Sequence, residues 1–197
     1  MSTLQSLQKS PHMMRNRMSD QTHDGRTIEV IFPPEQIAAR MSGLADEIAG
    51  AGFRDLLVVS ILKGSFIFAA DLIRALHVSG LAPQVDFLTL SSYGAGTKSR
   101  GEVRIVRDID LDVTGRDVLV VDDILESGRT LAFAKNMIAA RGAARVECCV
   151  LLDKPVARAA SVQPEFTAFP CPDVFVVGYG MDAAYRYREL PYVGRVV

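Results

Sequence analysis

The sequence predicts an α/β protein whose mostly parallel sheet is flanked by helices. Two runs, LLVVSIL at 56–62 and VLVV at 118–121, are continuously apolar and rich in β-branched residues, which is typical of strands covered on both faces. Segments with helical periodicity alternate with such runs, and strand–helix–strand alternation indicates a parallel sheet. With 197 residues, the chain can bury a core of its own without disulfides or metals.

The expected elements follow one another closely along the chain. TIEVIF at 27–32 is a short strand, and the segment 33–52 is an amphipathic helix with Pro34 in its first turn and glycines at its end. A glycine-rich polar loop at 93–101 and an antiparallel excursion at 102–115 interrupt the alternation. We expect the remaining strands at 56–62, 85–92, 118–123, 146–153 and 174–180, and the remaining helices at 65–77 and 131–142.

The chain divides into a leader and one domain. Residues 1–26 are polar, Met-rich and aperiodic, so we expect a flexible leader outside the fold. Lys9, Arg15 and Arg17 precede its first acidic residue, as in organellar transit peptides, but a disordered tail accounts for them more simply. Residues 27–197 show neither an internal repeat nor a second domain, and we expect them to fold as one unit.

Composition disfavours several classes of protein. The 22 Lys and Arg residues balance 23 Asp and Glu, so the chain as a whole has no charge suited to nucleic acid or a membrane surface. Lys63, Asp71 and Arg74 interrupt the best apolar stretch, and no membrane-spanning helix is expected. The three cysteines lack metal-binding or disulfide spacing, and two lie in the apolar run VECCVLL, which indicates buried thiols in a reducing, cytoplasmic compartment.

Three carboxylates crowd the end of one predicted strand. Asp122 and Asp123 directly follow VLVV, and Glu126 lies three residues further on. Like charges this close repel one another unless a cation, a polyhydroxyl ligand or a proton relieves them. A solvated acidic turn is the alternative, but ligands of parallel sheets gather at the carboxyl ends of the strands, which favours a binding site.

The next four residues, SGRT at 127–130, suit an anion. Gly128 lets backbone amides converge, Ser127 and Thr130 add hydroxyl donors, and the following helix begins here with the positive end of its dipole. The motif GxxxxGK is absent, which disfavours a nucleoside triphosphatase, and a receiver domain would carry its aspartates near the N-terminus. A ribose 5-phosphate satisfies both halves of the motif, with its hydroxyls on the carboxylates and its phosphate on the turn.

VLVVDDILESGRTL closely resembles the phosphoribosyl pyrophosphate (PRPP) binding signature of the type I phosphoribosyltransferases. Further motifs narrow the resemblance to the 6-oxopurine, or hypoxanthine-guanine, family over residues 27–197. They are LKGS at 62–65, SSY at 91–93, LLDKP at 151–155, VFVVGYGMD at 174–182 and YRELPYVG at 187–194. The resemblance implies the type I fold, in which segments from the chain ends form a small hood over the parallel sheet.

The resemblance also implies a reaction and the residues that carry it. The 5-phosphoribosyl group would pass from PRPP to a purine ring nitrogen, with release of pyrophosphate. Asp122 and Asp123 would bind the ribose hydroxyls and share Mg²⁺, and the phosphate would lie on Ser127, Gly128, Arg129 and Thr130. Glu126 matches the general base, although the family commonly has aspartate there.

The remaining matches assign the base, the pyrophosphate and a closing loop. Lys154 would recognise the purine 6-oxo group and reject the 6-amino group of adenine. Each of three residues also has an interpretation without a role in binding. Lys154 could be a surface lysine in a turn, Phe175 a core aromatic, and Arg188 a solvated charge. Phe175, Val176 and Asp182 would contact the purine, and Asp182 would also hold a second Mg²⁺. Pyrophosphate would bind to Lys63, Gly64 and Arg188, with the Leu62–Lys63 peptide in the cis form, and a loop led by Ser92 and Tyr93 would close over the site.

The function expected from these motifs is purine salvage. The substrates would be PRPP and hypoxanthine, with guanine as a further acceptor, and the products IMP or GMP and pyrophosphate. A xanthine-preferring enzyme is the nearest alternative, and a nucleic-acid-binding regulator on the same fold is a more distant one that lacks a basic signature here. The resemblance further implies a homodimer or homotetramer.

Overall fold

The computed structural model describes residues 21–23, 25–93 and 102–197. The strands of its central sheet are β3 (Leu57–Leu62), β4 (Gln84–Tyr93), β5 (Glu102–Arg107), β6 (Asp117–Leu125), β7 (Arg145–Asp153) and β8 (Phe166–Pro170). The strand order is β5–β4–β3–β6–β7–β8, and every neighbouring pair is parallel except β4 and β5. This confirms the mostly parallel sheet and the antiparallel excursion after β4.

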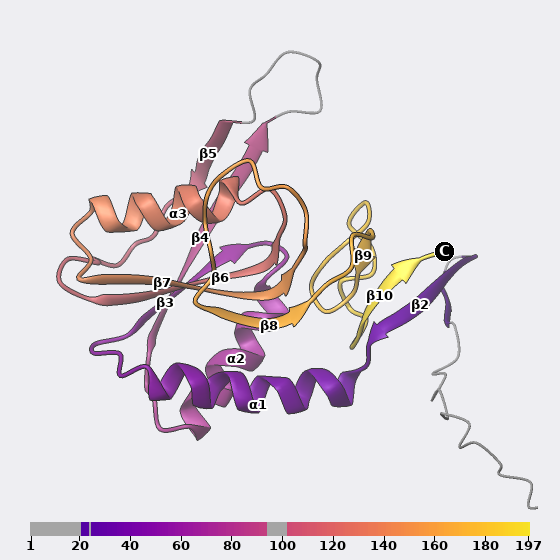
Figure 1. The fold of residues 1–197 in the computed structure, drawn as a ribbon, viewed down its shortest axis with the longest axis horizontal. Helices are drawn as coiled ribbons and strands as arrows, with labels where there is room; N and C mark the ends of the chain where they lie inside the picture. The colour runs from indigo at the N-terminus through magenta and orange to yellow at the C-terminus, as the bar shows by residue number, and fades with distance from the viewer. Residues whose placement is uncertain (1–20, 24, 94–101) are drawn as a thin grey trace, which may run out of the picture.

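Helices cover both faces of this sheet (Figure 1). The helices α1 (Pro34–Gly50) and α2 (Phe66–Val78) pack on one face, and α3 (Arg129–Ala140) packs on the other. Alternate residues of β6 serve the two cores: Leu119 and Val121 join the α1/α2 side, and Val118 and Val120 join the α3 side. Continuous apolar runs arise because both faces are buried. None of the helices in the described part of the chain is long and apolar enough to cross a bilayer.

A second, smaller sheet forms the hood expected from the resemblance. Its strands are β1 (Gln21–His23), β2 (Arg26–Phe32), β9 (Val176–Val177) and β10 (Val193–Val196), in the order β1–β2–β10–β9. The hood thus joins segments from both ends of the described chain beside the carboxyl end of the main sheet (Figure 1). The rings of Phe32 in β2 and Phe169 in β8 stack with 4.4 Å between centroids and connect the two sheets.

Four details differ from the sequence prediction. The run VFVVGYG is not a strand of the parallel sheet, because only Val176–Val177 is extended and it pairs with β10. The edge strand is instead β8, whose sequence FTAFP is short and buries only Ala168 and Phe169. Residues 21–23 pair with β2, so the fold begins earlier than residue 27. Strand β6 continues to Leu125, so Asp122 and Asp123 lie within the strand, near its carboxyl end.

Gly178 lies at a tight crossing in the hood, and we expect Gly178→Ala to destabilise the fold. Its φ is +92°, and a Cβ there would lie 2.1 Å from the backbone oxygen of Tyr192. The left-handed conformation and the overlap together predict a loss of about 2–5 kcal/mol in the free energy of unfolding, measured by urea titration. Gly50→Ala is the matched control, since no atom lies within 4 Å of its Cβ position. An equal loss in both variants would contradict this reading.

Candidate active site

The site lies where three parallel strands end side by side. β6 pairs with β3 on one side and β7 on the other, so the segments that follow β3 and β7 flank the end of β6. The structure thereby brings together Lys63–Gly64 after β3, Asp122 and Asp123 in β6, and Lys154 after β7. In open parallel sheets, ligands bind at this carboxyl end of the strands.

Asp122 and Asp123 form an acidic pair in which Asp122 is buried and Asp123 is partly buried. Asp122 is 6% exposed, and its Oδ1 accepts the backbone N–H of Asp123 at 3.1 Å. Burial, and secondly the neighbouring Asp123 carboxylate, raise the pKa of Asp122 well above the usual value. Burial also raises the pKa of Asp123, although hydrogen bonds to the Asp122 side chain and to nearby backbone N–H groups, and lastly the Arg188 guanidinium, partly oppose this. Two carboxylates held in this way favour a ligand that brings hydroxyl donors or positive charge.

Gly64 permits the loop after β3 to approach this pair. A Cβ on Gly64 would lie 1.7 Å from Oδ2 of Asp123, so a side chain larger than hydrogen would displace the carboxylate. The Leu62–Lys63 peptide that precedes it is cis, as the resemblance implied. On its other side, Gly64 meets the hood: a Cβ on Gly180 would lie 2.3 Å from the Gly64 carbonyl oxygen. The loop after β3 (the core loop, Lys63–Gly64), the acidic pair and the hood therefore meet at this glycine.

The SGRT turn has a defined shape at the N-terminus of α3. Gly128 adopts φ 77° as the residue before the helix, and its carbonyl accepts the N–H of Ala132 at 2.9 Å. The carbonyl of Ser127 accepts the N–H groups of Ala159 and Ala160 at 2.9 and 3.2 Å, which fixes the turn against that loop. Ser127 and Arg129 remain exposed. The turn is preorganised and open to solvent, as a phosphate site requires.

Glu126 and Lys154 form an ion pair across the site. Lys154 Nζ lies 3.3 Å from Glu126 Oε1, and the side chains are 7% and 56% exposed, respectively. The backbone N–H of Lys154 also donates to the carbonyl of Leu125 at 3.0 Å. Lys154 is therefore a buried cation and not a surface lysine in a turn. The arrangement holds a carboxylate and an ammonium together beside the end of β6.

The hood contributes an arginine and an aspartate. Arg188 donates through Nη1 to the Gly180 carbonyl at 2.6 Å and pairs through Nη2 with Asp182 Oδ1 at 2.6 Å. Its side chain is 22% exposed, so it is not an ordinary solvated charge. Asp182 also accepts the N–H of Tyr185 at 2.7 Å. Arg188 and Asp182 are thus held in place before any ligand arrives.

Two base-contact predictions differ in their surroundings. Phe175 is 63% exposed and is not a core aromatic, whereas Val176 is buried in β9.

Ser92 and Tyr93 end β4 opposite Val103 and Glu102 of β5. The loop expected to follow them, 94–101, lies outside the described residues, as do residues 1–20 and 24.

Comparison with known proteins decides the family. A family model for the phosphoribosyl transferase domain matches residues 28–184. The hypoxanthine phosphoribosyltransferase of Escherichia coli K12 is 44% identical over 174 residues, which cover 87% of this chain and 96% of that protein. The chain belongs to the hypoxanthine-guanine phosphoribosyltransferase family.

Other members of this family are similar in sequence and in structure. The hypoxanthine-guanine phosphoribosyltransferase of Bacillus subtilis is 41% identical over 168 residues, covering 84% of this chain and 91% of that protein. A crystal structure of a hypoxanthine-guanine phosphoribosyltransferase from Bacillus anthracis, with HEPES in its active site, superposes with a TM-score of 0.79 at 40% identity. The superposition covers 86% of this chain and 98% of the Bacillus anthracis chain. The type I phosphoribosyltransferase fold is thereby confirmed.

The acidic pair also bears on the metal that the family resemblance implies. Within the described ranges, no cluster of three or more His, Cys, Asp or Glu side chains could hold a metal ion. The adjacent carboxylates of Asp122 and Asp123 are nevertheless a fit for Mg²⁺, which retains several waters and is commonly held by one or two carboxylates together with substrate phosphates.

Sequence reasoning overlooked Gly180 and Tyr179 of the VFVVGYGMD motif. Gly180 has φ +99° and touches Gly64, and Tyr179 reaches Asp71 in α2. The two glycines in GYG were the available signal, because glycine within an apolar segment often marks a close backbone approach. The partners of these residues could not be named without the fold.

Proposed function

We propose that this family member is a purine salvage enzyme that transfers the 5-phosphoribosyl group from PRPP to hypoxanthine and guanine, giving IMP or GMP and pyrophosphate. The observation that carries this is the meeting of the Asp122–Asp123 pair, the SGRT turn at the N-terminus of α3 and the buried Lys154 at the carboxyl end of the main sheet. The names of the relatives in Escherichia coli and Bacillus subtilis support the same acceptors.

The acidic pair and the turn are proposed to hold PRPP. Asp122 and Asp123 accept the two ribose hydroxyls, while Ser127 and the amides of Gly128, Arg129 and Thr130 bind the 5-phosphate. As the bond between C1 and the pyrophosphate oxygen breaks, the sugar gains oxocarbenium character, and the nearby carboxylates stabilise that charge. The purine nitrogen then bonds to C1. Ser92 and Tyr93 lead the loop that excludes water from the oxocarbenium-like sugar.

Pyrophosphate and metal are proposed to lie between the core loop and the hood. The Lys63–Gly64 backbone and the Arg188 side chain bind pyrophosphate, and Asp182 faces the same ligand. Mg²⁺ held by Asp122 and Asp123, and a second ion by Asp182, would neutralise charge on the departing group.

The purine is proposed to lie between Phe175, Val176 and the Glu126–Lys154 pair. A 6-oxopurine offers an acceptor to the Lys154 ammonium, whereas the amino group of adenine offers only donors and would leave the buried cation without a partner in the base. Glu126 lies within reach of the same ligand and accepts the proton of the attacking nitrogen. All three 6-oxopurines share the recognised oxygen, so the 2-position must distinguish them.

The test of this function is nucleotide formation from PRPP, Mg²⁺ and each of four purines. We expect hypoxanthine and guanine to react at least about 10²-fold faster than adenine in kcat/KM, because a buried donor without a partner is costly. Faster reaction with xanthine would favour the xanthine-preferring alternative. Adenine as the best acceptor would contradict the role of Lys154, and binding of RNA or DNA without any turnover would favour a regulator.

The remaining proposals concern assembly and location. We propose a homodimer or homotetramer, measurable by light scattering after size-exclusion chromatography. We also propose a cytoplasmic location, which the three buried free cysteines support, since they suit a reducing compartment.

A further inference from the structure

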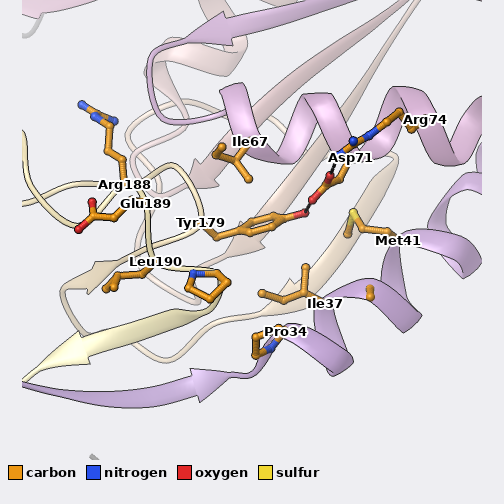
Figure 2. A pocket seen from close by; sticks show the side chains of 12 residues that line it. Pro34, Ile37, Met41, Ile67, Asp71, Arg74, Tyr179, Arg188, Glu189 and Leu190 are labelled. Atoms are coloured by element: carbon orange, nitrogen blue, oxygen red, sulfur yellow. Dashed lines mark hydrogen bonds and ion pairs between the residues drawn. The ribbon is translucent and has the colours of Figure 1, made fainter. Parts of the chain in front are cut away.

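One hydrogen bond joins the hood to helix α2 beneath the proposed pyrophosphate site. The hydroxyl of Tyr179 donates to Oδ2 of Asp71 at 2.6 Å. Figure 2 shows the Tyr179 ring extending from the hood between Ile67 and Ile37 to reach this carboxylate on α2. Tyr179 is 4% exposed, whereas the Asp71 side chain is 34% exposed, so the bond lies at the boundary between the core and solvent. Burial, and secondly the Asp71 carboxylate, raise the pKa of Tyr179, so its hydroxyl remains a donor through neutral pH.

On the hood side, Tyr179 belongs to the backbone that holds Arg188. Its N–H donates to the Leu190 carbonyl at 2.9 Å, and the N–H of Gly180 donates to the Arg188 carbonyl at 3.0 Å. The Arg188 guanidinium returns to the Gly180 carbonyl at 2.6 Å. A displacement of Tyr179 would therefore move Gly180 and, with it, both the backbone and the side chain of Arg188.

On the core side, Asp71 belongs to the helix that follows the pyrophosphate loop. Helix α2 begins at Phe66, directly after Lys63, Gly64 and Ser65, and Ser65 is anchored by a 2.7 Å hydrogen bond between its hydroxyl and that of Ser60. The hydrogen bond to Asp71 therefore ties the hood to an element that is rigidly continuous with Lys63–Gly64. The contact between Gly180 and Gly64 is where the two sides meet.

Two features indicate that this bond does more than satisfy a buried hydroxyl. Tyr179 has φ 49°, a left-handed conformation that costs a non-glycine residue free energy, and this conformation accompanies the ring's path toward α2. The bond also borders a pocket of about 650 Å³ between α1, α2 and the hood (Figure 2). Where the ring faces this gap, fewer atoms pack against it, so a hydrogen bond to a charged acceptor has a larger share in setting the position of Tyr179.

We propose that Tyr179 and Asp71 are a positioning pair that sets the spacing between the two halves of the pyrophosphate site, Lys63–Gly64 on the core and Arg188 with Asp182 on the hood. This inference rests on the proposed function. Neither residue touches substrate: each acts through the backbone that carries the binding groups. The pair therefore controls affinity for PRPP and pyrophosphate, and leaves recognition of the purine to Lys154 and its neighbours.

The test compares Tyr179→Phe with the wild-type chain in both reaction directions. Phenylalanine keeps the ring and its packing but removes the donor. We expect the KM for PRPP, and the KM for pyrophosphate in the reverse reaction with IMP, to rise about three- to tenfold, while the KM for hypoxanthine changes less than about twofold. A merely structural role would instead lower the thermal midpoint and reduce kcat without this division between substrates.

Variants of Asp71 complete the test. Asp71→Ala should reproduce the rise in KM, although it also removes the ion pair between Asp71 and Arg74. Adding Tyr179→Phe to Asp71→Ala should raise these KM values no further, because the bond between the two residues is already absent. Asp71→Asn retains an acceptor oxygen and should stay within about twofold of wild type. Unchanged KM values for PRPP and pyrophosphate in Tyr179→Phe, with an active wild type, would overturn the positioning role alone. A wild-type chain that forms no nucleotide would overturn the proposed function itself and this inference with it.

Discussion

Glu126→Gln is expected to lower kcat about 10²- to 10⁴-fold, the range that a positioned general base contributes. Glutamine has nearly the same shape as glutamate, and its amide oxygen can still accept from Lys154 Nζ, which lies 3.3 Å from the present carboxylate. The substitution therefore removes the capacity to take a proton and leaves the pairing of the site largely intact. The KM for PRPP should change less than about threefold, because the contacts proposed for the ribose and the phosphate lie at other residues.

Glu126→Asp is the informative companion, because it restores the residue that the family commonly has. Removal of one methylene withdraws the carboxylate by about 1.5 Å, which is about half of the 3 Å over which a base must reach its proton. We expect this variant to lose less turnover than Glu126→Gln, because it keeps a carboxylate that can take the proton and only the reach changes. Initial rates at saturating PRPP and hypoxanthine measure both variants. Equal losses in kcat and in PRPP affinity for Glu126→Gln would make Glu126 a structural residue.

Asp122→Asn is expected to stabilise the fold while it impairs PRPP binding. The pKa of Asp122 is raised in the folded state, so the folded protein favours the protonated carboxyl. The stability that protonated Asp122 contributes is fully present below the unfolded pKa of about 3.9, and it is lost as the pH rises through the higher folded pKa. At pH 7.5, the variant avoids the charged form, and we expect its free energy of unfolding without ligand to exceed that of wild type by about 1–3 kcal/mol.

Urea titration at several pH values between 4 and 8 measures this effect. The difference between variant and wild type should grow as the pH rises, and the KM for PRPP should increase at least about tenfold, through the loss of a charge-assisted bond to a ribose hydroxyl. A lower stability of Asp122→Asn at pH 7.5 would show that the carboxylate is satisfied within the protein.

Asp86→Asn is the matched control for this experiment. Asp86 is also buried, at 8% exposure, but it accepts the backbone N–H groups of Phe87, Asp110 and Leu111 at 2.7, 2.7 and 2.9 Å. An amide there would place an NH₂ group where an acceptor is needed, so we expect Asp86→Asn to destabilise the fold. The opposite signs at two buried aspartates would separate an acid that serves the fold from one that serves a ligand.

Local patterns predicted most of the main sheet and its helices. LLVVSIL, VLVV and VECCVLL are strands because their apolar side chains fill cores on both faces, and the helix expected at 33–52 is observed at Pro34–Gly50. The edge strand β8 was missed because FTAFP is only five residues long and Thr167 interrupts its apolar residues. VFVVGYG was placed in the wrong sheet, because an apolar run encodes burial and does not encode its partner.

The sequence by itself determined which residue types are available for chemistry: the acids Asp122, Asp123 and Glu126, the SGRT turn and Lys154, each at the end of a recognisable strand. Only the tertiary structure decided how they meet, with Lys154 against Glu126, Gly64 against Asp123, and Tyr179 of the hood bonded to Asp71 of α2. The physical reason is range. Periodicity and turn chemistry act over a few residues, whereas these contacts join segments far apart in the chain that only the packing of sheet, helix and hood brings within hydrogen-bonding distance.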